Sequence, residues 1–119
     1  MKDENPVLVK SYAFAKRIVL LDKLLLDNKQ PRSVADQILR CGTSIGANVE
    51  EAVGGFSRRD FAAKCNIAYE EACEAHYWLR LLRDTECLDS HLAASMIDDA
   101  EELKRILAAI IISTRTPTE

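Results

Sequence analysis

The sequence predicts an all-α protein, folded as an antiparallel up-down-up-down bundle of four helices. Three observations indicate this fold class. Apolar residues recur at steps of three and four along four long segments, and no window alternates with the period of two that is typical of a strand. Only four glycines and three prolines occur among 119 residues, too few for a turn-rich β fold. The length suits one domain over residues 1–119 with a single core.

The first helix is expected over residues 6–28. Asn5 followed by Pro6 is typical of a helix start, with an N-cap side chain and then a proline at the first helical position. One line of residues at helical spacing should face the core: Val7, Ser11, Phe14, Ile18, Leu21 and Leu25. A second line runs beside it: Leu8, Tyr12, Ala15, Val19 and Leu26. Two adjacent lines make an apolar face wider than one neighbouring helix needs.

The second helix is expected over residues 32–53, after Pro31 and before the Gly54–Gly55 stop. Its core line is Val34, Ile38, Cys41, Ile45, Val49 and Ala52. Gly42 and Gly46 lie four residues apart on one face of this helix. A glycine inside a helix costs about 1 kcal/mol relative to alanine. The two glycines therefore predict that a neighbouring helix approaches closely.

The third helix is expected over residues 58–85, with Ser57 as its N-cap and Asp60 at the third helical position. A heptad line should face the core: Phe61, Cys65, Ala68, Ala72, Ala75, Leu79 and Leu82.

The fourth helix is expected over residues 90–114, capped by Asp89 or Ser90. Its core line is Ala93, Met96, Ala100, Leu103, Leu107 and Ile110. Short loops between such helices are typical of an up-down bundle.

Five polar residues on the second and third helices stand out beside the apolar lines: Ser44, Asn48, Glu51, Glu71 and Glu74. We interpret them first as packing or interface residues, because buried carboxylates need partners. Glu71 and Glu74 would accept hydrogen bonds from Ser44, Asn48 or Tyr12, or would pair with an arginine across a subunit contact. The alternative is a carboxylate-lined polar site that binds a small molecule or a metal ion.

Five basic residues around the second helix and the start of the third could contact phosphates: Arg32, Arg40, Arg58, Arg59 and Lys64. Arg58 and Arg59 also lie at a helix N-terminus, where backbone N–H groups favour anions. Acidic residues are interleaved with them, and the net charge is −3. Since non-specific nucleic-acid binding depends on positive charge, a solvated mixed surface is favoured over an RNA or DNA edge.

No combination of residues predicts an enzyme, a cofactor site or a metal centre. Di-iron bundles need Glu-x-x-His motifs, and the residues three before His76 and His91 are Cys73 and Leu88. The four cysteines form no CxxC pair and no zinc-ligand spacing. We expect no catalytic residue, no cofactor and no metal. With no visible export signal and no apolar run long enough for a bilayer, we expect a cytoplasmic protein without membrane contact.

Two motifs resemble a known family. Ser44–Ala52 reads SIGANVEEA, and Ile67–Leu82 reads IAYEEACEAHYWLRLL. They are similar to the four-helix bundle proteins called 23S rRNA intervening-sequence proteins. Many relatives read IAEG where this chain has Val49–Ala52, which places it in a branch ending in Glu-Ala. The resemblance implies a homopentamer around a central channel, and it carries no enzymatic activity.

The sequence therefore predicts a non-enzymatic scaffold whose main partner is another copy of itself, with any further protein partner unidentified. The doubled apolar lines offer more apolar surface than one bundle of this size can bury, and a closed assembly would bury the excess. Nucleic-acid binding at the basic residues and ligand binding at the polar residues are the alternatives.

Overall fold

The computed structural model describes residues 5–115, which form four helices: α1 (Pro6–Asp27), α2 (Arg32–Val53), α3 (Arg58–Asp84) and α4 (Ser90–Ser113). Each bound lies within one residue of the one expected from the sequence. No strand occurs in this part of the chain. Among the four described helices, none has the continuous apolar stretch that a membrane span requires.

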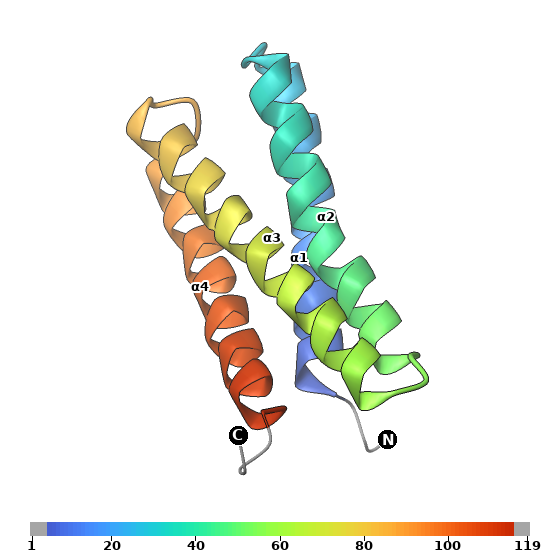
Figure 1. Ribbon diagram of the computed structural model, residues 1–119. Coiled ribbons are helices and arrows are strands. Elements are labelled where there is room, and N and C mark those ends of the chain that lie inside the picture. Colours follow the sequence, from blue (N-terminus) through green and yellow to red (C-terminus); the bar gives the residue numbers. More distant parts are fainter. Residues whose placement is uncertain (1–4, 116–119) are drawn as a thin grey trace.

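Each helix packs against its neighbours in sequence, and α1 also contacts α4 less extensively. The α1–α2 and α3–α4 loops lie at one end of the molecule (Figure 1). The α2–α3 loop lies at the other end, together with the start of α1 and the end of α4. Within residues 5–115, α1 makes no contact with α3. These two helices therefore occupy opposite corners of the bundle.

Side-chain caps start three of the helices. The Oδ1 atom of Asn5 accepts a hydrogen bond from the N–H of Val7 at 3.0 Å. Ser57 accepts one from Asp60, and Asp89 accepts one from Leu92, each at 3.0 Å. Of the two residues proposed to cap α4, the structure selects Asp89. Pro31 stands at the start of α2 without a side-chain cap.

The core follows the lines that helical spacing predicts. All six predicted residues of α1 are buried, including Ser11, whose hydroxyl donates to the Leu8 carbonyl at 3.3 Å. Three predicted core residues are only half-buried: Val34, Phe61 and Ile110. Each lies near the end of its helix, where fewer neighbouring side chains cover it. Near the start of α2, Ala35 is buried in place of Val34.

Close contact between α1 and α2 accounts for the two helical glycines. A Cβ atom added to Gly42 would lie 2.6 Å from Cγ1 of Ile18. One added to Gly46 would lie 3.3 Å from the backbone oxygen of Ser11. Ordinary carbon–carbon contacts are about 3.5–4.0 Å, so α1 occupies the space that a side chain at Gly42 would need. The predicted close approach is confirmed, and the helix that makes it is α1.

Left-handed residues close two of the helices, and neither is a glycine. Lys29 follows α1 and Glu86 follows α3, each with a φ of 59°. In both turns a backbone N–H reaches back to the helix: Gln30 donates to Leu25, and Cys87 donates to Leu82, each at 2.9 Å. Gly54 does end α2, but at a φ of −85°. The C-terminal end of α2, which has a glycine, therefore does not use the left-handed conformation that often ends a helix at glycine.

Candidate functional site

An ionic cluster joins α2 to α3. Arg40 on α2 reaches across to two glutamates on α3: its Nη1 lies 3.2 Å from Oε1 of Glu71, and its Nη2 lies 2.6 Å from Oε2 of Glu74. The indole Nε1 of Trp78 donates to the same Glu74 oxygen at 3.0 Å. The hydrogen bond from Arg40, and next the one from Trp78, hold the pKa of Glu74 below its ordinary value. The cluster therefore bridges α2 and α3.

The remaining polar residues of α2 are bonded within short range. The Asn48 amide donates to the Ser44 carbonyl at 2.9 Å and to the Ser44 hydroxyl at 3.0 Å. Glu51 pairs with Lys64 of α3 at 2.7 Å. The five predicted polar residues therefore lie along the α2–α3 contact, but they form separate pairs and do not converge on one centre.

In the part of the chain that the structure describes, the two α3 glutamates do not pair with Ser44, Asn48 or Tyr12, as we expected, and their partner is Arg40 of the same chain. The other expected partner, an arginine across a subunit contact, stays a prediction. The long arginine side chain spans the α2–α3 contact, whereas the Asn48 amide is already bonded within its own helix. The sequence did indicate that Arg40 lies on the same face of the helix as Ser44 and Asn48, because the three residues follow one another at steps of four.

The five basic residues do not form one patch. Arg40 and Lys64 are held in ion pairs with glutamates. Arg32 lies at the start of α2, whereas Arg58 and Arg59 lie at the start of α3, at the opposite end of the bundle. The 22 residues of α2 separate them by about 33 Å at 1.5 Å per residue. The sequence-based expectation that these side chains gather is therefore corrected by the arrangement of the helices.

Carboxylates in this region face cations of the chain and leave no ready ligand set for a metal. Glu71 and Glu74 both face Arg40, and Glu51 faces Lys64. Among residues 5–115, no group of three or more histidine, cysteine, aspartate or glutamate side chains could hold a metal ion.

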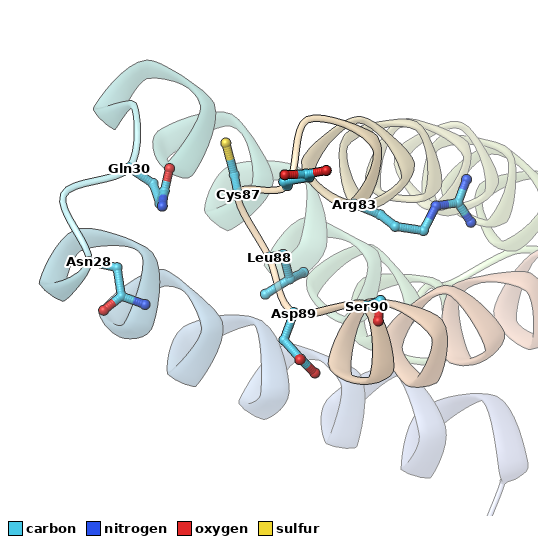
Figure 2. A pocket seen from close by; sticks show the side chains of 8 residues that line it. Asn28, Gln30, Arg83, Cys87, Leu88, Asp89 and Ser90 are labelled. Carbon is cyan, nitrogen blue, oxygen red and sulfur yellow. The ribbon is translucent and has the colours of Figure 1, made fainter.

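A hollow of about 550 Å³ lies where the α1–α2 and α3–α4 loops come together. Figure 2 shows Asn28 and Gln30 from the first loop on one side of it, and Cys87, Leu88 and Asp89 from the second on the other. Asp89 caps α4, and Arg83 bonds to the neighbouring Asp84 at 2.8 Å. No residue of either predicted set lines this hollow, and its Asp89 and Arg83 side chains are bonded to groups close by in the sequence.

Another group of polar residues, centred on His76, lies between α3 and α4. The Nε2 atom of His76 is buried 3.3 Å from a carboxylate oxygen of Glu101, without a well-oriented hydrogen bond. Its Nδ1 atom lies 3.5 Å from Nζ of Lys104. Burial, and next the positive charges of Lys104 and Arg80, lower the pKa of His76 from its ordinary 6.5. The lowered pKa favours the neutral form of the ring, which packs as part of the α3–α4 contact.

The outer faces of α1 and α3 carry exposed apolar side chains. We call the first the α1 face: Val9, Tyr12, Lys16, Val19, Leu20 and Lys23. We call the second the α3 face: Ile67, Glu70, Glu74, Tyr77 and Leu81. Tyr12 and Leu20 are 61% and 64% exposed. A shallow hollow of about 410 Å³ follows the α1 face between Tyr12 and Leu20. Phe56, in the α2–α3 loop, is fully exposed.

Comparison with known proteins identifies the family. A family model described as 23S rRNA-intervening sequence protein matches residues 3–109. A crystal structure of a protein of unknown function from the S23 ribosomal protein family, from Bacteroides thetaiotaomicron, is similar to this one with a TM-score of 0.85, and the two sequences are 46% identical. The match covers 88% of this chain and 97% of that chain. No curated protein matches. The chain belongs to the 23S rRNA-intervening sequence protein family.

Proposed function

We propose that this protein is a non-enzymatic, cytoplasmic scaffold whose working form is a homo-oligomer of up-down-up-down bundles. The observation that carries the proposal is the apolar surface left uncovered on the α1 and α3 faces. Leu20 and Tyr12 lie on the same face of α1, and both are more than half exposed. Exposed apolar residues that occur singly are ordinary, whereas a contiguous apolar patch larger than is usual for a monomer marks an interaction site.

The polar features support assembly better than catalysis. Arg40, Glu71 and Glu74 satisfy one another across α2 and α3. These ion pairs join α2 to α3 within one chain, and they occupy both carboxylates, so neither Glu71 nor Glu74 is free to act as a general base. The resemblance to the family implies five copies, which is the oligomer that we propose.

Light scattering coupled to size-exclusion chromatography tests the proposal. One chain has a mass of 13.3 kDa, and five chains give about 67 kDa. We expect the larger mass at micromolar protein concentration, with dissociation on dilution if the contact is weak. A mass of one chain across the whole concentration range would contradict the proposal. A stable dimer or hexamer would be consistent with the proposed scaffold but would contradict the proposed pentamer.

A further inference from the structure

The two exposed faces differ in charge. On the α1 face, Lys16 and Lys23 are exposed, and no ion pair within residues 5–115 joins either of them. The other cations of α1 point elsewhere, because Lys10 and Arg17 pair with Glu102 and Asp99 of α4. The α1 face is therefore apolar and basic.

The α3 face is apolar and acidic. Glu70 is exposed between Ile67 and Tyr77, and no ion pair within the described chain joins it. Beside it, the two carboxylates of Glu71 and Glu74 share the single guanidinium of Arg40, which leaves that cluster with net negative charge. Opposite charges on two apolar surfaces favour contact between them and disfavour contact of either surface with itself.

The positions of the charges along the two helices also match. Both helices begin at the same end of the molecule (Figure 1). Lys16 and Lys23 lie roughly 15 Å and 26 Å from the start of α1, at 1.5 Å per residue. Glu70 and Glu74 lie roughly 18 Å and 24 Å from the start of α3 on the same scale. If neighbouring copies stand side by side with parallel axes, each lysine faces a glutamate at nearly the same height.

We propose that the α1 face of one copy packs against the α3 face of the next copy, with Lys16 opposite Glu70 and Lys23 opposite Glu74 and Tyr77. The inference rests on the self-assembly proposed above and specifies its contact. Because α1 and α3 occupy opposite corners of the bundle, each copy offers one face to each of two neighbours. Such a heterologous contact repeats from copy to copy until it closes into a ring.

Charge exchange tests the pairing. K16E and E70K each place like charges opposite one another, so each should raise the protein concentration for half-assembly at least tenfold. The double variant K16E/E70K restores an opposite pair in reversed order and should return assembly to near the wild-type concentration. Sedimentation velocity measures all three, and circular dichroism establishes that each variant is folded. Restoration in the double variant is an outcome that loss of folding cannot imitate.

A mixing experiment tests the heterologous geometry. K16E/L20E removes the α1 face, and E70K/Y77K removes the α3 face. Each variant alone should be a monomer, whereas an equimolar mixture should assemble, because the intact α1 face of E70K/Y77K meets the intact α3 face of K16E/L20E. The matched control R105E/A109E makes a similar change on the exposed side of α4 and should assemble as the wild type does.

The outcomes separate this inference from the proposed function. If the wild-type protein assembles and K16E/L20E keeps its size, the proposed contact is wrong and the scaffold proposal stands. If E70K/Y77K assembles alone while K16E/L20E does not, α1 meets α1 and the heterologous contact is wrong. A wild-type protein that is monomeric at every concentration overturns both.

Discussion

Gly42→Ala should destabilise the fold, although alanine is the better helix former. Alanine in place of glycine in a helix is worth about 1 kcal/mol. The new Cβ, however, would lie 2.6, 2.8 and 2.9 Å from three side-chain carbons of Ile18. Ile18 is fully buried and branched at Cβ, so it cannot rotate away into solvent. The steric cost must therefore be met by displacing α1 from α2.

The magnitude follows from these opposing effects. Overpacking a well-packed core costs about 1–3 kcal/mol, and three contacts below 3 Å place this site in the upper part of that range. When the better helix propensity of alanine is included, we expect the free energy of unfolding to fall by about 1–2 kcal/mol. The melting temperature should fall by several degrees, roughly 4 °C for each kcal/mol in a chain of this size.

A double-mutant cycle isolates the contact. Ile18→Ala should cost about 2–5 kcal/mol, because it leaves a cavity in the core. In that background Gly42→Ala no longer clashes, and it should recover about 1 kcal/mol. The coupling between the two substitutions should therefore be about 2–3 kcal/mol in favour of the double variant. Urea unfolding at one fixed protein concentration, followed by Trp78 fluorescence, measures all four free energies.

Gly54→Ala is the matched control. A Cβ at Gly54 meets only the Glu50 backbone oxygen, at 3.5 Å, and its φ of −85° suits any residue. This change should be neutral or should stabilise by up to about 1 kcal/mol, because it restricts the unfolded chain. If Gly42→Ala proves as stable as Gly54→Ala, the close packing of α1 on α2 is refuted.

Three further predictions concern the turns and the ionic groups. Lys29→Gly and Glu86→Gly should each stabilise the fold by about 0.5–1 kcal/mol in calorimetry, because both residues hold a φ of 59° that glycine adopts without strain; a lower melting temperature would count against this. Burial and nearby cations lower the pKa of His76, so the unfolded chain takes up the proton first and stability falls as the pH drops below the ordinary value of 6.5. His76→Gln should flatten the dependence of the free energy of unfolding on pH, measured by urea unfolding between pH 7.5 and 5. A pH dependence like that of the wild type would contradict this role of His76. Arg40→Met should let the pKa of Glu74 rise toward its ordinary value in an NMR titration, and an unmoved value would show that Arg40 does not set it.

The sequence was most informative about where helices begin and which side faces the core. Asn5, Ser57 and Asp89 can each satisfy a free N–H at a helix start, and that is a local property. The apolar periodicity then identifies the buried line of each helix without knowledge of its neighbours. These two kinds of information account for the helix bounds and for most of the core.

Contacts between helices were harder to predict. The spacing of Arg40, Ser44 and Asn48 places Arg40 on the polar side of α2, but its pairing with Glu71 and Glu74 also depends on how α2 is rotated and shifted against α3. The left-handed residues Lys29 and Glu86 carry no glycine signal, although the next residue in each turn donates a backbone hydrogen bond back to its helix. The scattered basic residues looked close only because they are near in sequence, whereas a helix of 22 residues holds them apart.

Small-angle X-ray scattering tests the central claim, which is that copies meet through their exposed apolar faces. A single chain has a radius of gyration of 15.1 Å. Five copies in one compact body would give about 25 Å, from the scaling of radius with residue number. We predict a value near the larger figure at micromolar concentration, and a fall toward the smaller one for K16E/L20E. A wild-type value that stays near 15 Å at every concentration would contradict the account.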